Sequence, residues 1–225
     1  MGPRPRRAGR RAPDLNVPGR IPPLHLVATD DIAGDPAFSA AAAELLERGG
    51  SKLALHLRLL RSSGAALYEL ASRLAPIAAA TGALLIVNDR VDVALAARCS
   101  GVQLGGRGMS VGDARHLLGR DARIGVSVHD PDAAQRAASQ GADFLLVGTL
   151  YATATHPGAA ANGLGLLREL SAVSIPRIGI GGVRPARVRE AMHAGADGVA
   201  VVRGIWRAPS PGGALMEYLN QLHDA

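Results

Sequence analysis

Residues 177–201 read RIGIGGVRPARVREAMHAGADGVAV. Two short apolar runs, Arg177–Ile180 and Gly198–Val201, enclose a helix-patterned stretch from Pro185 to His193. Proline is tolerated in a first helical turn, and Gly195 stands where a helix needs a C-terminal stop. The stretch therefore predicts a strand–helix–strand unit, and a right-handed crossover makes its two strands parallel.

The same organisation repeats along the chain. Gly141-Ala142-Asp143 stands at the point of an earlier unit that Gly195-Ala196-Asp197 occupies in this one. Apolar runs that are too continuous for half-exposed strands alternate with helical stretches. The expected strands are Leu24–Ala28, Leu53–Leu57, Leu84–Val87, Gly101–Leu104, Arg123–Val126, Phe144–Val147, Arg177–Ile180 and Gly198–Val201. The expected helices are Ala37–Arg48, Ala65–Ala80, Val111–Leu118, Pro131–Gln140, Leu166–Val173, Pro185–His193 and Gly213–His223.

Eight such units in about 200 residues predict an α/β fold, a single-domain (β/α)8 TIM barrel over residues 23–225. An open doubly wound sheet is the alternative architecture. It would require a glycine-rich fingerprint after the first strand, and the segment TDDIAG at 29–34 does not provide one. In a barrel the chemistry lies in the loops that follow the strands, so candidate residues are sought there.

Composition and charge narrow the classes of protein. The chain has 225 residues, 48% of them hydrophobic, which suits one well-cored domain. The net charge of +6 is concentrated at the start, where residues 1–20 hold six arginines and one aspartate. We expect residues 1–22 to form a disordered basic leader, with contact to an anionic polymer as the alternative. The nearly neutral remainder argues against nucleic acid as a partner.

Cysteine usage and hydropathy point to the cytoplasm. Cys99 is the lone cysteine and cannot form an internal disulfide bond. No apolar run approaches the ~20 residues of a membrane span, and the arginine-rich start lacks the hydrophobic segment of a signal peptide. We therefore expect a cytoplasmic protein without a membrane partner.

The last two strands are followed by a candidate phosphate site. Gly181 and Gly182 follow the seventh run, and Val202, Arg203 and Gly204 follow the eighth. Glycines at these barrel loops let backbone N–H groups approach an anion, and Arg203 adds positive charge. The alternative is that the glycine pair only permits a tight turn.

Polar side chains also follow the second and third strands. His56 and Arg58 alternate on one face of the second strand, and Asn88 and Asp89 end the third. An arginine is well shaped to clamp a carboxylate or phosphate. Two structural alternatives stay open: His56 as a hydrogen-bonded core residue, and Asp89 as the ion-pair partner of Arg90.

The fifth and sixth strands complete the candidate set. Ser127 and His129 share one side of the fifth strand, and histidine is the side chain best matched to move protons near neutral pH. His129 packed on Pro131 at the helix entry is the structural alternative. The loop after the sixth strand is long for a barrel, as in lids and binding loops, and it presents the hydroxyls of Thr153 and Thr155.

In order along the chain, these motifs resemble the family of thiamine phosphate synthases and the related thiazole tautomerases. The resembling stretches are Leu26–Asp30, His56–Arg58, Ile86–Asp92, Gly101–Gly105, Gly125–His129, Thr153–Thr155 with Pro157-Gly158, and Ile180–Gly182. The resemblance covers about residues 24 to 220 and implies a barrel that binds a phosphorylated thiazole. It places the phosphate at the seventh and eighth loops and adds Gln103 and His156 to the substrate-binding residues. Family relatives are often homo-oligomers, so the resemblance leaves a homo-oligomer open for this chain.

Three departures bear on the reaction. The synthase pattern expects a lysine at Leu60, a magnesium-binding aspartate where Gly106–Met109 offers no carboxylate, and a lysine at His156. Asp89 would then be the sole remaining magnesium ligand. Because ionising a diphosphate requires cationic stabilisation, we expect a thiazole tautomerase that needs no metal and uses His129 as its catalytic group. The alternatives are a Mg²⁺-dependent thiamine phosphate synthase and a non-catalytic binder of a thiazole or thiamine phosphate.

Overall fold

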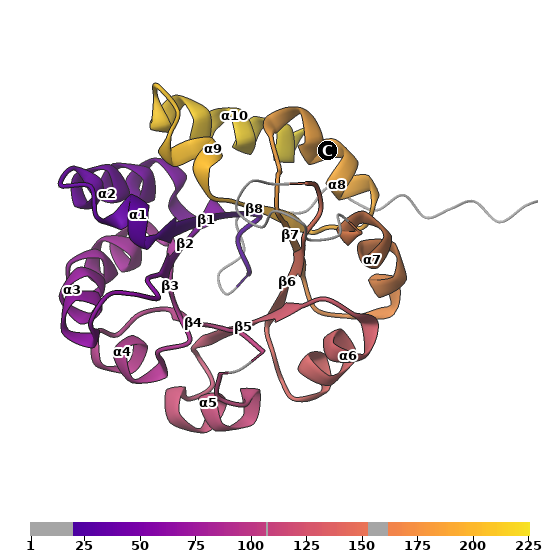
Figure 1. The fold of residues 1–225 in the computed structure, drawn as a ribbon, viewed down its shortest axis with the longest axis horizontal. Coiled ribbons are helices and arrows are strands. Elements are labelled where there is room, and N and C mark those ends of the chain that lie inside the picture. Colours follow the sequence, from indigo (N-terminus) through magenta and orange to yellow (C-terminus); the bar gives the residue numbers. More distant parts are fainter. Residues whose placement is uncertain (1–19, 107, 153–161) are drawn as a thin grey trace, which may run out of the picture.

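The computed structural model describes residues 20–106, 108–152 and 162–225. Eight parallel strands close into a barrel in sequence order, and the helices surround it (Figure 1). The strands are β1 Leu24–Thr29, β2 Leu53–Arg58, β3 Leu84–Asn88, β4 Gly101–Leu104, β5 Arg123–Val128, β6 Phe144–Gly148, β7 Arg177–Ile180 and β8 Gly198–Val201. The α-helices are α1 Asp30–Ala33, α2 Phe38–Gly49, α3 Gly64–Thr81, α4 Val91–Ala96, α5 Val111–Leu118, α6 Pro131–Ser139, α7 Gly163–Glu169, α8 Val188–His193, α9 Arg203–Trp206 and α10 Pro211–His223. Short 3-10 turns cover Gly50–Lys52, Leu170–Ala172 and Pro185–Arg187.

The predicted barrel is confirmed, and every expected strand is present. The expected helix boundaries differ in places because 3-10 turns carry part of two elements: Pro185–Arg187 precedes α8, and Leu170–Ala172 follows α7. The sequence prediction missed α1, α4 and α9. They have four, six and four residues, which is too short for a helical period to show in the sequence.

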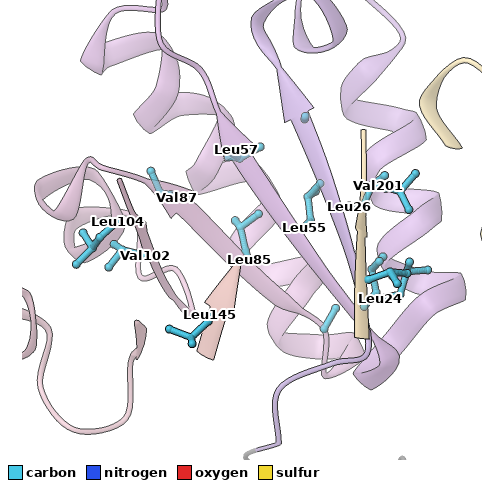
Figure 2. Close-up of a cluster of buried hydrophobic side chains, with 14 of the residues drawn as sticks. Leu24, Leu26, Leu55, Leu57, Leu85, Val87, Val102, Leu104, Leu145 and Val201 are labelled. Carbon is cyan, nitrogen blue, oxygen red and sulfur yellow. The ribbon is translucent and has the colours of Figure 1, made fainter. Parts of the chain in front are cut away.

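The main core lies between the outside of the barrel and the helices. Leucine and valine side chains that point outward from neighbouring strands gather there, as Figure 2 shows for Leu24, Leu55, Leu85 and Val102. These four side chains are at most 1% exposed. Burying a leucine side chain contributes about 1.5–3 kcal/mol, so this layer holds the helices against the sheet.

A second, smaller core fills the barrel interior. It contains Val27, Phe144, Leu146 and Ile178, and Ile21 packs in the same cluster. Residues 21 and 22 fall in the expected leader, and both are buried; the rest of that leader, residues 1–19, lies outside the described residues. In the part of the chain that the structure describes, no helix is both long and apolar enough to cross a membrane.

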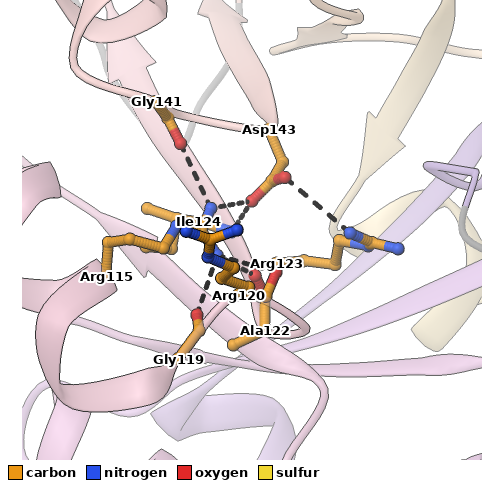
Figure 3. Close-up of polar contacts among 8 residues, drawn as sticks. All are labelled: Arg115, Gly119, Arg120, Ala122, Arg123, Ile124, Gly141 and Asp143. Carbon is orange, nitrogen blue, oxygen red and sulfur yellow. Dashed lines mark hydrogen bonds and ion pairs between the residues drawn. The ribbon is translucent and has the colours of Figure 1, made fainter.

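The aspartates of the repeated Gly-Ala-Asp triplets form hydrogen bonds with the amino ends of neighbouring strands. Gly141 and Gly195 adopt positive φ values of 89° and 108°, as expected at helix ends. Asp143 Oδ2 then accepts hydrogen bonds from the backbone N–H of Ile124 and from Arg115 Nη2, at 2.7 and 2.6 Å (Figure 3). Asp197 Oδ2 accepts in the same way from the backbone N–H and the Nε of Arg177, both at 3.0 Å. Each triplet thus links a helix end to the preceding strand.

Strand register decides which side chains reach the mouth of the barrel. Val27 is the register partner of His56, and Asn88 is the partner of Gln103. Because side chains alternate along a strand, residues two positions further on share the inward face. The inward face of β2 therefore carries His56 and then Arg58 toward the carboxyl end.

Candidate active site

A cavity of about 1080 Å³ opens at the carboxyl ends of the strands. This volume is at the upper end of the range for small-molecule sites, so the cavity has room for more than one small ring. The residues that line it come from all parts of the barrel mouth. Those that the sequence predicted are His56, Arg58, Asn88, Asp89, Ser127, His129, Gly181, Gly182, Val202, Arg203 and Gly204.

The charge of the cavity is strongly positive. Among its described lining residues, arginines 58, 184, 187 and 203 face a single carboxylate, Asp89. The sequence pattern did not single out Arg184 and Arg187, although both follow the glycine pair of the seventh loop. A cluster of arginines in a concave site favours anionic ligands and focuses their approach.

Backbone conformation brings the seventh loop close to the sixth. Gly181 and Gly182 have φ values of 105° and 64°, a region that favours glycine. A Cβ on Gly182 would lie 2.9 Å from the Ala152 carbonyl oxygen, and one on Gly181 would lie 2.6 Å from Thr149 Cγ2. Both glycines are therefore required for close packing, and both still line the cavity.

Arg187 is held in place by contacts with neighbouring loops. Its Nη1 donates to the Gly182 carbonyl oxygen at 2.9 Å, and its guanidinium lies 4.5 Å above the centre of the Tyr151 ring. The Tyr151 hydroxyl donates to Glu190 Oε2 at 2.9 Å. Burial and this carboxylate raise the pKa of Tyr151 to about 12, so the phenol stays protonated and keeps its bond to Glu190.

Asp89 lies on the opposite side of the mouth. Its Oδ1 accepts a hydrogen bond from the Gly105 N–H at 2.7 Å. The alternative pairing of Asp89 with Arg90 is not present, because Arg90 forms its ion pair with Asp92 at 2.6 Å. This bond and this charge hold the pKa of the Asp92 carboxyl below its ordinary value. Asp89 is therefore available to the cavity.

The described residues do not assemble a ligand set that would retain a metal ion by itself. No group of three His, Cys, Asp or Glu side chains comes together among them. Asp89 alone fits Mg²⁺ in another way, because Mg²⁺ is often held by one carboxylate together with substrate phosphates. A second carboxylate was expected at Gly108. A Cβ added to Gly108 would lie 3.0 Å from Asp89 Oδ1.

His129 is oriented by the end of β6. Its Nδ1 lies 3.0 Å from the Gly148 carbonyl oxygen, which can only accept, so Nδ1 carries the proton. In the neutral ring Nε2 is then left as the acceptor. The Ser127 hydroxyl receives a hydrogen bond from Gln103 Nε2 at 3.0 Å. Gln103 itself is 1% exposed and does not line the cavity, so it acts on the site through Ser127.

His56 lies at the floor of the cavity and is fully buried. Its Nε2 is 2.8 Å from Nδ1 of His25, a residue that the sequence analysis did not single out. His56 is therefore packed as a hydrogen-bonded core residue, as the structural alternative stated. It also lines the cavity, so it remains part of the site. Nothing in the sequence pattern joins the two histidines, because only the strand register brings them together.

Of the three departures from the synthase pattern, one borders the cavity, because Gly106 lines it. Leu60 is 60% exposed and is absent from the cavity lining. Thr153, Thr155 and His156 lie outside the described residues.

Fold and site together define a class: a (β/α)8-barrel protein with an arginine-lined cavity at the carboxyl ends of its strands. The family model described as thiamine monophosphate synthase matches residues 24–205. The chain belongs to this family.

Individual relatives agree with this assignment. The chain is 40% identical over 181 residues to a thiamine-phosphate synthase of Methanoculleus marisnigri, which spans 80% of this chain and 85% of the relative. It is 46% identical over 151 residues to a thiamine-phosphate synthase of Haloquadratum walsbyi. The matched region covers 65% of this chain and 68% of the relative. Among solved structures, a thiamine phosphate pyrophosphorylase from Pyrococcus furiosus superposes with a TM-score of 0.77 at 30% identity and covers 89% of this chain and 95% of its own.

These relatives correct one prediction. The sequence motifs favoured a thiazole tautomerase first and a synthase second, and this order is wrong because these relatives are named for the synthase or pyrophosphorylase activity. The physical error was to count two expected lysines and one expected aspartate as lost without counting the cations that other loops supply. The arginines at 184 and 187 line the cavity and were left out of that count.

Proposed function

We propose that this chain is a thiamine-phosphate synthase. It joins a hydroxymethylpyrimidine diphosphate to a thiazole phosphate and releases diphosphate. Both substrates are small phosphorylated molecules. The observation that carries the proposal is the set of four arginines around one large cavity, because two anionic substrates must be held there at once.

The arginines divide between two sides of the mouth. Arg184, Arg187 and Arg203 follow β7 and β8, beside the glycines that resemble the phosphate loop of the family. Arg58 ends β2, on the side that Asn88 and Asp89 occupy. We assign the thiazole phosphate to the first side and the diphosphate to the second.

The reaction breaks the C–O bond between the pyrimidine methylene group and the diphosphate, and the electron pair leaves with the diphosphate. The thiazole nitrogen then donates its lone pair to the methylene carbon, and the ring becomes cationic. Arg58 stabilises the negative charge that develops on the leaving group, which is the largest task in such a step. Ser127 and His129 border the space between the two sides and orient the rings.

Asp89 would hold a Mg²⁺ ion that enters with the diphosphate. That ion would neutralise part of the charge on the leaving group. Because the described lining contains no second carboxylate, we propose that retention of the ion depends on the substrate phosphates.

The test combines the purified protein with both precursors, with Mg²⁺ and with a chelator, and measures thiamine phosphate by its conversion to fluorescent thiochrome. We expect product with Mg²⁺ and a loss of at least tenfold in Arg58→Gln, since a charge-assisted hydrogen bond contributes about 1.5–3 kcal/mol. Arg61→Gln is the matched control, because that side chain is 78% exposed. Tight binding of either precursor without product would favour a non-catalytic binder and overturn the proposal.

A further inference from the structure

A line of buried polar groups runs from the floor of the barrel to the cavity. His25 Nε2 lies 2.9 Å from the Pro22 carbonyl oxygen, and His25 Nδ1 lies 2.8 Å from His56 Nε2. Both histidines are fully buried inside the barrel. The Asn88 side chain interacts with His56, and Asn88 is partly exposed in the cavity wall.

The first group in this line sets the protonation of the others. A carbonyl oxygen only accepts, so His25 Nε2 carries the proton that it donates to Pro22. Burial lowers the pKa of His25 to about 3, and this ring is therefore neutral with a lone pair on Nδ1. His56 Nε2 must then be the donor to His25. Because burial also holds the pKa of His56 well below its ordinary value, His56 is neutral and its Nδ1 is an acceptor.

In the present orientation of the Asn88 amide, His56 and Asn88 form no hydrogen bond with each other. His56 Nδ1 and Asn88 Oδ1 are both buried, and neither has a hydrogen-bond partner among the described residues. Two acceptors cannot bond to each other. Turning the Asn88 amide by 180° about its last torsion places Nδ2 toward His56 as a donor, and it turns Oδ1 toward the cavity. One buried acceptor is then satisfied, and the other meets whatever occupies the cavity.

We propose that His25 and His56 are positioning residues that fix the polarity of the Asn88 amide, so that Asn88 presents its carbonyl oxygen to the cavity. The ligand group at that point is an N–H or O–H donor. This inference rests on the proposed function for one detail: of its two substrates, the aminopyrimidine carries N–H donors on its ring substituent and the thiazole phosphate carries none. Asn88 then selects the pyrimidine at the second and third strands.

The tautomers are measured directly by long-range ¹H–¹⁵N correlation spectra of the full chain labelled with ¹⁵N-histidine. Two of the seven histidines should keep the neutral Nε2–H form between pH 5 and 8, and a His56→Gln sample assigns the second of them. A neutral Nδ1–H form of His56 would overturn the proposal. This readout needs no substrate, so it stands apart from any failure of the proposed synthase reaction.

The polarity of the amide is tested by ligand discrimination. Calorimetry compares the aminopyrimidine diphosphate with the analogue in which hydrogen replaces the amino group. The unmodified chain should bind the analogue about tenfold more weakly, because a buried acceptor loses its donor. In His25→Leu the two ligands should differ by less than about threefold, since His56 is then free to change tautomer and Asn88 to turn.

A matched variant separates this effect from simple loss of packing. The Phe144 ring contacts both histidine rings, with centroids 5.1 and 6.2 Å away, and it forms no hydrogen bond with them. Phe144→Leu should therefore keep the tenfold discrimination and the Nε2–H signal of His56. Equal discrimination in His25→Leu and Phe144→Leu would refute the positioning role.

Discussion

Arg187 offers the sharpest test of the proposed anion site. The change Arg187→Gln keeps a polar side chain and removes the charge that lies 4.5 Å above the Tyr151 ring. It also removes the donor to the Gly182 carbonyl oxygen, which positions the seventh loop. A hydrogen bond from a charged group contributes about 1.5–3 kcal/mol, and the open mouth favours the lower part of that range. At about 1.4 kcal/mol for each factor of ten, the loss is about 10–30-fold.

The assay measures kcat and KM for the thiazole phosphate with the pyrimidine diphosphate at saturation. We expect the loss to fall mainly on KM and to shrink at high salt, since salt screens the attraction between Arg187 and the phosphate in the parent chain and the variant has no charge at this position. Arg189→Gln is the control, because Arg189 lies two residues away, does not line the cavity and pairs at 3.5 Å with Asp224. If both variants stay within twofold of the parent chain, Arg187 does not bind the phosphate and the assignment of that side of the mouth fails.

Three further predictions concern the scaffold. Asp143→Asn should lower the free energy of unfolding by about 2–4 kcal/mol in urea titrations, because Arg115 and the Ile124 N–H lose their anionic acceptor. As a control, Glu44→Gln removes an exposed ion pair with Arg48 and should cost at most about 0.5 kcal/mol. Gly101→Ala should lower the melting temperature by roughly 10 °C, since the new Cβ would meet the backbone of the neighbouring strand. A Cβ at Gly106 would have no atom within 4 Å, so Gly106→Ala should leave the melting temperature nearly unchanged. Below about pH 6.5 His25 is protonated in the unfolded chain, but in the folded chain its pKa of about 3 keeps it neutral. The free energy of unfolding should therefore fall by about 2 kcal/mol between pH 7 and pH 5. His25→Leu should remove this part of the fall.

The barrel could be predicted from the chain because its signals are local. An apolar run, a helical period and a glycine stop recur in each unit, and each can be recognised within a few residues. The Gly-Ala-Asp triplets belong to this class of signal, and the structure explains them: Asp143 and Asp197 accept from the backbone of the strand before them. A glycine ends the helix, and an aspartate two residues later holds the neighbouring strand.

The site was predicted only in part because its contacts are not local. The mouth residues at the strand ends, such as Arg58 and His129, follow from alternation along a strand. The pairing of His25 with His56 joins positions 31 residues apart and depends on the register of β1 with β2. Arg187 enters the cavity from the 3-10 turn Pro185–Arg187, which is the first part of a run, Pro185–His193, that the sequence predicts to be one continuous helix.

The error about the reaction has the same origin. The expected lysines and aspartate were compared position by position, so a leucine at 60 and a glycine at 108 counted as lost charge. Coulomb energy depends on the distance between charges and on the medium between them, and it does not depend on which loop supplies a charge. Arginines from the seventh and eighth loops can therefore stabilise an anion in the same cavity. An inventory of charges around the cavity, taken after the fold is known, is a better guide to the chemistry than a comparison of single motif positions.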